Sequence, residues 1–343
     1  MNNLNLRLVS LILLIITIIW IILKLHTHLK IESFDNSVNI QVNFIKVSPA
    51  KSIIKKNHQS YFKQLQPMEL VARNVLKKES DYQQPNIIST IEDFYCSQIL
   101  EFSIEEETLF RQLIIETISK CPYKQLHKYF RDWNIIKVSD LFEDGLPHTI
   151  DKYIIIPESF VSDVINLISQ GKHREAIISY GSTLSHEQIH VLQRVHPKIF
   201  SNLYTQFWNY TMIPENKMNP VIDNYVDKYQ RLNPDGLNNN YWFQLNKNEL
   251  LMVYVKLKTY SLEDVSKLAL IINSHDFKVI ETNPLNNYSK YLSYFGNIGN
   301  NYHPNELVAT LLSEYIMLSN YYGNTKVQKC LAISQLKKWI ETL

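Results

Sequence analysis

Two histidines and a glutamate within one short stretch carry the clearest chemical signal in the chain. The sequence from Ser185 reads Ser-His-Glu-Gln-Ile-His, so His186 and His190 are four residues apart and Glu187 lies between them. On an α-helix, residues four apart lie about 40° apart around the axis and about 6 Å along it, so both imidazoles can reach one ion. Glu187 lies about 100° around the helix from His186, where it can contact a water on that ion but does not easily join the ligand pair. The stretch predicts a Zn²⁺ site with Glu187 as general base.

This chemistry requires a helix, and the neighbouring residues favour one. The apolar positions that could pack such a helix are Leu184, Ile189, Val191 and Leu192. Ser185 or Thr183 can cap its start, and Pro197 prevents its continuation. The alternative is a pair of surface histidines on an ordinary amphipathic helix, with no metal.

A catalytic zinc needs a third protein ligand and one open position, and two residues compete for the third place. His196 follows His186 by ten residues, but Gln193 stands where a glycine would let the chain leave the helix. A glutamine that enters the positive φ required there costs about 1 to 2 kcal/mol. If the helix continues, His196 lies about 15 Å along the axis from His186 and cannot bind the same ion. Pro304 fits the first position of a helix, which places Glu306 in its opening turn. We expect Glu306 to be the third ligand and keep His196 as the alternative; the helix dipole alone also favours a glutamate at this position.

Together, these residues resemble the zincin metallopeptidases, in particular the gluzincin-like ones with a glutamate ligand on a later helix. The resemblance covers about residues 90 to 340 and is specific at the two motifs. It implies that His186, His190 and Glu306 are zinc ligands and that Glu187 is the general base. Thr310 departs from the pattern, because many gluzincins have an acidic residue four positions after the glutamate ligand, where it orients a ligand histidine.

The resemblance also implies a fold and a substrate. We expect an α+β, zincin-like domain in which the active-site helix packs under a small mixed sheet and the C-terminal part is mainly helical. The loop Leu146-Pro147-His148-Thr149, which leads into Tyr153 to Ile156, resembles the strand along which zincins bind an extended peptide by β-pairing. Tyr302 and His303 are the candidates for stabilising the transition state, because they directly precede the helix of Glu306.

Periodicity predicts the elements that must position this site. Apolar residues at helical spacing predict a helix over 104–118, with Ser103 as N-cap and Pro122 just beyond the end. Runs of β-type residues predict paired strands over 133–138 and 152–156, followed by a helix over about 159–170.

The first 30 residues predict a membrane anchor. Residues 8–23 are uncharged and almost wholly apolar, and Arg7 and Lys24 flank them, so residues 7–24 could cross a bilayer as one tilted helix. A cleaved signal peptide is the rival interpretation, but small residues at signal-peptidase spacing are missing after Lys24. We therefore expect a single-pass anchor at 1–30, a stalk or small helical subdomain at 31–90 and the catalytic domain at 91–343, on either side of the membrane.

Composition excludes several other classes. The 35 Lys and Arg residues nearly balance the 33 Asp and Glu residues, so we expect no nucleic-acid partner. Only seven glycines are present, without a phosphate-binding loop pattern, so we expect no nucleotide. The sequence therefore predicts a membrane-anchored zinc metallopeptidase that acts on peptides or proteins. The alternative is a membrane-anchored binding or structural protein that keeps the zincin fold but has lost activity.

Overall fold

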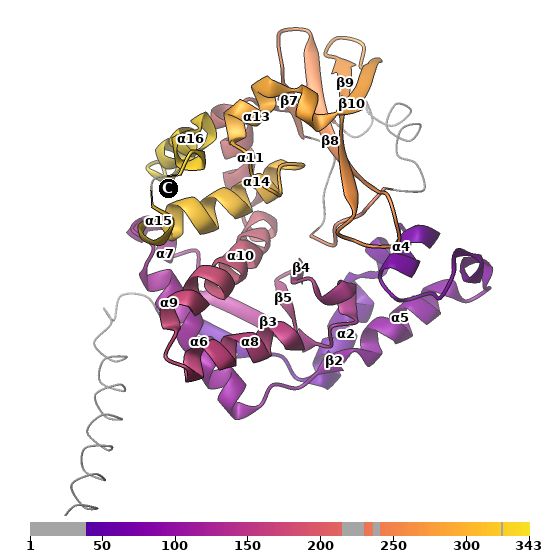
Figure 1. Cartoon of the computed structure of the whole chain (residues 1–343), viewed down its shortest axis with the longest axis vertical. Helices are drawn as coiled ribbons and strands as arrows, with labels where there is room; N and C mark the ends of the chain where they lie inside the picture. Colours follow the sequence, from indigo (N-terminus) through magenta and orange to yellow (C-terminus); the bar gives the residue numbers. More distant parts are fainter. Residues whose placement is uncertain (1–38, 215–229, 236–240, 324) are drawn as a thin grey trace, which may run out of the picture. The chain divides into compact units, whose positions relative to one another are not determined.

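The chain forms an α+β structure with two five-stranded sheets, as a computed structural model describes it for residues 39–214, 230–235, 241–323 and 325–343 (Figure 1). Residues 40–343 cluster as one compact unit.

The first sheet is mixed and contains both of the predicted strands. Its members are β1 (Gln41–Phe44), β2 (Ile99–Leu100), β3 (Asp132–Val138), β4 (His148–Ile150) and β5 (Tyr153–Pro157). The order is β1-β3-β5-β4, and β2 also pairs with β3. β1 and β5 run parallel to β3, whereas β4 runs antiparallel to β5 and forms an edge of the sheet. The predicted pairing of residues 133–138 with 152–156 is confirmed. The loop between them contains a further short strand, β4, which periodicity in the sequence does not predict.

Alternating side chains of β3 and β5 pack on opposite faces of this sheet. Ile135 joins one buried cluster with residues of α6 (Ile104–Ser119) and α8 (Glu158–Ser169). Its neighbour Ile136 joins a second cluster, with α2 (Val47–Asn57) and α5 (Ile87–Ser97). This period of two is that of a strand buried on both sides. The predicted helices over 104–118 and 159–170 are confirmed as α6 and α8, and Ser103 caps α6 by accepting the Glu106 amide at 3.2 Å.

The helix that carries the two histidines lies inside the molecule. It follows α9 (His173–Ala176) and the π-helical turn η3 (Ile177–Gly181) without a break and runs as α10 from Ser182 to Val195. α10 packs against β4, β5 and α14 (Pro304–Thr310). Most of its side chains are buried, which is typical of a helix surrounded by structure rather than one with a solvent face. The helix ends at His196, and Pro197 begins α11 (Pro197–Asn202).

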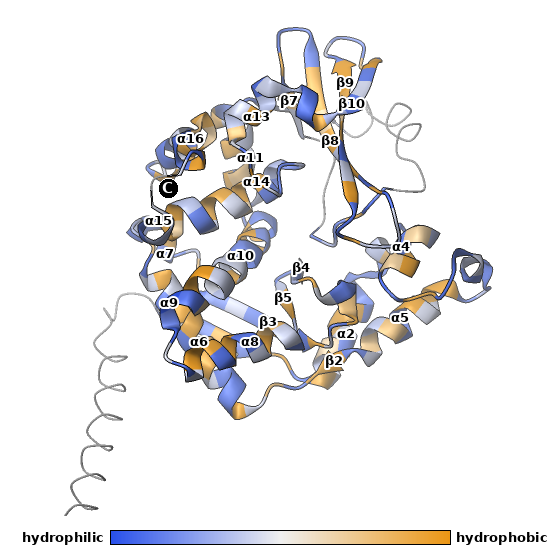
Figure 2. Cartoon of the chain, in the orientation of Figure 1, coloured by the Kyte–Doolittle hydropathy of each residue, from blue (hydrophilic) through white to orange (hydrophobic). Residues whose placement is uncertain are grey.

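A second sheet occupies the middle of the C-terminal half. Its strands are β6 (Tyr210–Met212), β7 (Tyr241–Gln244), β8 (Glu249–Leu257), β9 (Val265–Asn273) and β10 (Val279–Pro284), all antiparallel, in the order β10-β9-β8-β7-β6. Hydrophobic residues run along β8 and β9 (Figure 2). The predicted fold class is therefore wrong in this part: the region expected to be mainly helical contains a five-stranded antiparallel sheet, and the structure has two sheets rather than one small mixed one.

Helices complete the chain after this sheet. They are α13 (Ser289–Phe295), α14, the π-helical η6 (Leu311–Met317), α15 (Ser319–Tyr322) and α16 (Leu331–Ile340). The remaining short helical pieces of the described chain are α3 (Gln59–Phe62), α4 (Pro67–Ala72), η1 (Glu79–Gln83), α7 (Lys124–His127), η2 (Phe142–Gly145), η4 (Leu203–Phe207), η5 (Leu285–Asn287) and η7 (Val327–Lys329).

The membrane prediction also needs correction. The proposed anchor at residues 7–24 lies outside the described residues, and among the helices that are described, none has the length and apolar character needed to span a bilayer. The assignment as a single-pass membrane protein, and the transmembrane helix included in the predicted fold class, are therefore withdrawn.

Candidate metal centre

Three side chains from two helices converge at one point. His186 and His190 extend from α10, and their Nε2 atoms lie 3.1 Å apart. Glu306 reaches them from the first turn of α14, with Oε2 at 3.3 Å from His186 Nε2 and Oε1 at 3.4 Å from His190 Nε2. Ligand atoms around a tetrahedral zinc, at bond lengths of about 2.0 to 2.1 Å, lie about 3.3 to 3.4 Å from one another. The two imidazoles and the carboxylate therefore have the chemistry and the spacing to hold such an ion.

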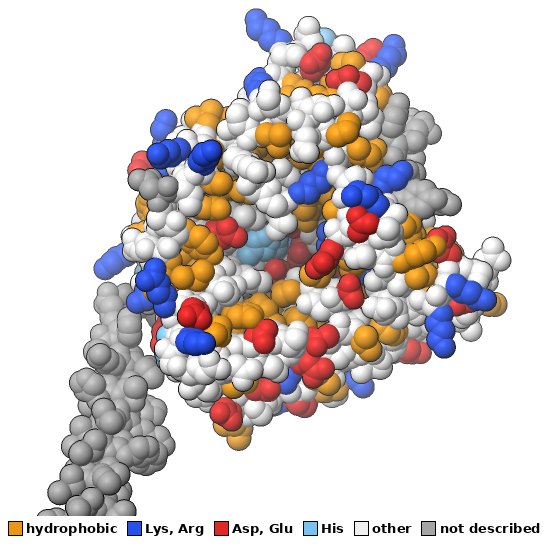
Figure 3. All heavy atoms as spheres, in the orientation of Figure 1, with side chains coloured by type: hydrophobic (Ala, Val, Ile, Leu, Met, Phe, Trp, Pro, Cys, Tyr) orange, Lys and Arg blue, Asp and Glu red, His pale blue; other side chains and the backbone are white. Residues whose placement is uncertain are grey.

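The cluster is buried on one side and reachable on the other. His190 and Glu306 are almost fully buried, whereas the His186 side chain keeps 14% of its exposure. Figure 3 shows histidine side chains at the bottom of a hollow on the face of the molecule that it draws. A small molecule could approach the cluster from the His186 side.

A chain of hydrogen bonds sets the orientation of the His190 ring. The side-chain nitrogen Nε2 of Gln193 donates to the backbone carbonyl oxygen of Asn305 at 2.9 Å. The Gln193 Oε1 atom is therefore an acceptor, 2.9 Å from His190 Nδ1. His190 therefore carries a proton on Nδ1 and points Nε2 toward the cluster. Such support for a ligand histidine is a common feature of metal sites. Gln193, which occupies the position where a glycine could break the helix, thus orients the His190 ring.

Charges in the cluster shift the pKa of His190 and the pKa of Glu306 in opposite directions. Burial alone lowers the pKa of His190, but the carboxylates of Glu306 and Asp235 outweigh it and raise that pKa to about 10. Burial alone raises the pKa of Glu306, but His190 and His186 outweigh it and hold that pKa well below its usual value. Without a metal, the cluster is therefore a cation beside an anion.

Glu187 lies beside the cluster in an environment suited to proton transfer. Burial raises the pKa of its carboxyl well above the usual value, and Asp235 adds to the shift. Its Oε2 atom is buried without a hydrogen-bond partner among the described residues. An unpartnered buried carboxylate oxygen next to a donor set is free to bond a water or a substrate proton.

Two residues of the site come from a loop that sequence reasoning did not single out. Asn233 donates from Nδ2 to Glu306 Oε1 at 2.7 Å and to the Tyr302 hydroxyl at 3.0 Å. Asp235 accepts from the Thr149 amide at 2.7 Å and from its hydroxyl at 2.6 Å. The sequence here reads Asn-Pro-Asp, which by itself is only a turn signal.

Asp235 connects the edge strand to the histidine helix. Its carboxylate lies 3.7 Å from Arg194 Nη2, and Arg194 also donates to the Thr149 hydroxyl at 2.5 Å. One oxygen of Asp235, one of Glu187 and one nitrogen of His190 lie within 4.8 Å of one another, so Asp235 stands at the border of the candidate metal centre.

The remaining predicted site residues lie around the cluster in different ways. Tyr302 is close to it, and burial together with the Glu306 charge raises its pKa well above the usual value. His303 caps α14, because its Nδ1 accepts the Asn305 amide at 3.1 Å. Thr310 has a buried hydroxyl without a partner among the described residues, so it does not take over the orienting role of an acidic residue. In the next turn, burial raises the pKa of the Glu314 carboxyl, and the charge of His186 opposes part of that rise.

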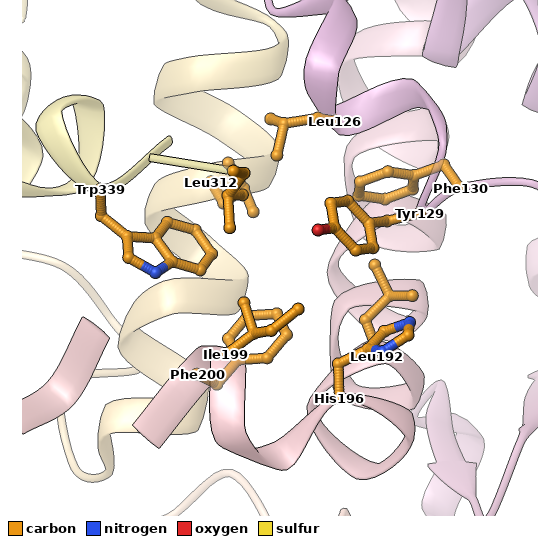
Figure 4. A pocket seen from close by; sticks show the side chains of 10 residues that line it. Leu126, Tyr129, Phe130, Leu192, His196, Ile199, Phe200, Leu312 and Trp339 are labelled. Carbon is orange, nitrogen blue, oxygen red and sulfur yellow. The ribbon is translucent and has the colours of Figure 1, made fainter. Parts of the chain in front are cut away.

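His196 is not brought to the cluster. It lies at the end of α10, where its ring packs 5.3 Å from that of Tyr129. There it joins a separate, largely apolar pocket (Figure 4). The residues lining this pocket are Leu126, Tyr129, Phe130, Leu192, His196, Ile199, Phe200, Leu312, Trp339 and Leu343. Because α10 stays helical to Val195, His196 remains about 15 Å along the axis from His186.

Comparisons with known proteins add no assignment: no protein-family model matches the chain, and searches of curated proteins and of solved structures gave no significant match.

Proposed function

We propose that this chain is a zinc-dependent hydrolase of peptide bonds. The observation that carries the proposal is the convergence of three side chains, His186, His190 and Glu306, whose nearest nitrogen and oxygen atoms lie 3.1 to 3.4 Å apart. The unpartnered oxygen of Glu187 belongs to the residue next to His186. Two imidazoles and one carboxylate leave a fourth position open around zinc, which is the arrangement of catalytic rather than structural sites.

The residues divide the chemistry between them. A zinc ion held by the three ligands would supply Lewis acidity toward a scissile carbonyl and toward water. Glu187 takes a proton from the attacking water at Oε2 and later returns it to the leaving amine, because this buried oxygen has no other hydrogen-bond partner among the described residues. Gln193 keeps the His190 lone pair directed at the ligand position.

A metal-binding protein without hydrolytic activity is the second candidate, and one observation favours it. β4 forms the edge of its sheet, and its residue Thr149 gives its amide to Asp235 instead of leaving it available for an extended peptide. A peptide that pairs with β4 at this residue must first displace Asp235.

The deciding experiment combines metal analysis with a cleavage assay on the full-length protein. We expect close to one zinc per chain by mass spectrometry and cleavage of a mixed peptide library. Glu187→Gln should retain zinc and lose about 10²- to 10⁴-fold in cleavage rate, as expected when a general base is removed. Glu105→Gln, at an exposed position of α6, is the matched control and should leave both unchanged.

Two further variants test the third ligand. Glu306→Gln should release zinc, whereas His196→Ala should retain it. Zinc with no cleavage by the parent of any peptide in the library would favour the second candidate, and a parent that binds no zinc would refute both.

A further inference from the structure

Asn233 touches the carboxylate that we assign to the metal. Its Nδ2 atom lies 2.7 Å from Glu306 Oε1 and 3.0 Å from the Tyr302 hydroxyl. A primary amide nitrogen has two hydrogens, so these two bonds use both of them. Because the amide is neutral, it fixes the carboxylate without cancelling the negative charge that attracts a cation.

The orientation of this amide is set by the backbone beside it. Asn233 Oδ1 accepts the amide of Asp235 at 3.0 Å, so the oxygen end of the side chain faces its own loop. The nitrogen end must then face Glu306. The hydrogen-bond network therefore assigns the two ends of the amide, which are otherwise difficult to distinguish.

The residues around Asn233, which we call the strap (Leu232, Asn233, Pro234 and Asp235), are held at both ends. At one end, the Leu232 amide donates to Glu69 Oε1 at 2.6 Å, and the Leu232 carbonyl accepts from Arg73 Nη2 at 2.8 Å. Glu69 and Arg73 belong to α4 and its C-cap, are buried, and pair at 3.2 Å.

At the other end of the strap, Asp235 is bound to the edge strand through the Thr149 amide and hydroxyl. Fixed ends leave the Asn233 side chain little freedom to move away from Glu306.

We propose that Asn233 is a positioning residue that holds Glu306 in the orientation required for metal binding. This inference rests on the metal site of the proposed function and extends it to a residue 73 positions before the ligand. Hydrogen-bonding partners of metal ligands typically change metal affinity by about 10- to 100-fold when removed. The strap is therefore part of the centre and not merely a loop that passes over it.

The test measures metal binding by the full-length protein, independently of catalysis. Zn²⁺ affinity is determined by competition with a chromophoric chelator, and the visible spectrum of the Co²⁺-loaded protein reports ligand geometry. Asn233→Ala should weaken Zn²⁺ binding by about 10- to 100-fold and shift the Co²⁺ bands. Asn233→Asp should weaken it further, because a carboxylate then faces Glu306 without a donor.

The matched control is Asn43→Ala. Asn43 lies in β1, at the opposite edge of the sheet from β4, and donates to the Asn134 side chain at 3.1 Å. The Asn43→Ala variant should leave both the Zn²⁺ affinity and the Co²⁺ spectrum unchanged. Asn233→Ser, which keeps a small polar residue in the turn but cannot reach Glu306, repeats the measurement if the alanine variant does not fold.

The outcomes separate this inference from the proposed function. A parent protein that binds neither Zn²⁺ nor Co²⁺ refutes the metal site itself. If the parent binds and Asn233→Ala gives the same affinity and spectrum, only the positioning role is refuted. Tighter binding in the variant would mean that the strap competes with the metal, which also overturns the proposal.

Discussion

At the scale of single residues, the candidate site depends on where the protons of His190 reside. Gln193 keeps one proton on Nδ1, and the carboxylates around the ring favour a second one on Nε2, since the pKa of His190 is raised to about 10. A metal ion needs the Nε2 lone pair. Metal and proton therefore compete for the same atom, and metal binding should release a proton throughout the neutral range.

This competition predicts a pH-dependent difference in stability. The pKa of His190 is higher in the metal-free folded chain than in the unfolded chain, so its stabilising contribution is complete below about pH 6.5 and is lost as the pH rises toward 10. The melting temperature of the metal-free protein should therefore fall over this interval. Zinc replaces the proton, so the zinc-loaded protein should lose less stability over the same interval.

Differential scanning calorimetry between pH 6.5 and 10, with chelator or with zinc, measures both curves. Parallel curves would contradict the assignment of His190 as a ligand. His275→Ala, at an exposed histidine, is the control and should follow the parent.

Local sequence could predict the part of the site that lies on regular helices. The spacing of His186 and His190 fixes their separation once α10 is helical, and Pro304 places Glu306 in a first turn. Asn233 and Asp235 could not be found in this way. Their partners are 73 and 86 residues away, and a turn motif in a chain rich in asparagine does not indicate which carboxylate or strand it will contact.

At the scale of elements, both helices that carry the candidate ligands continue through a π-helical turn. η3 leads directly into α10, and α14 leads directly into η6. Such turns are uncommon and occur frequently at functional sites. At the last residue of η3, Gly181 packs so closely on α6 that an added Cβ would collide with the Thr117 hydroxyl. This contact sets how near the histidine helix approaches α6.

Gly181→Ala should therefore destabilise the protein by about 1 to 3 kcal/mol, as overpacking of a core does. An ordinary Gly→Ala substitution inside a helix has the opposite effect and increases the stability of the protein. Thr117→Ala removes the colliding oxygen, so the double variant should recover part of the loss. Chemical denaturation of the four proteins gives the coupling, and additive effects would contradict the proposed collision.

The second sheet shows why the fold class was predicted only in part. β3, β5 and α6 were recognisable from apolar spacing and the Ser103 cap, and the structure has them. β8 is buried along most of its nine residues, so it lacks the alternation that separates a half-buried strand from a helix. β4 has three residues, too few for any period to be visible. Tertiary pairing, rather than local pattern, defines these strands.

At the scale of the whole molecule, the candidate ligands join segments that are distant in sequence. His190 and Glu306 are separated by the entire antiparallel sheet, and they meet only because α10 packs against α14. A metal bound there holds the folded chain together, because the unfolded chain does not bring these ligands together.

Zinc should therefore raise the thermal stability of the protein as a unit. At a free concentration about a thousandfold above its dissociation constant, a ligand specific for the folded state stabilises by about 4 kcal/mol. For a chain of this size, the melting temperature should rise by on the order of 10 °C. Calorimetry with and without a chelator measures the shift, which should vanish in Glu306→Gln. An undiminished shift in that variant would place the stabilising ion elsewhere.

The bond between Asp235 and Thr149 has a consequence for self-association. An edge strand with free amides is a template onto which another chain can add, and proteins commonly protect such edges with charged groups. Here the sheet ends at β4 with the carboxylate of Asp235 on the Thr149 amide, so a second molecule finds no free donor at that residue. The carboxylate at the border of the candidate metal centre thus also blocks the pairing of a second chain with β4 at this position.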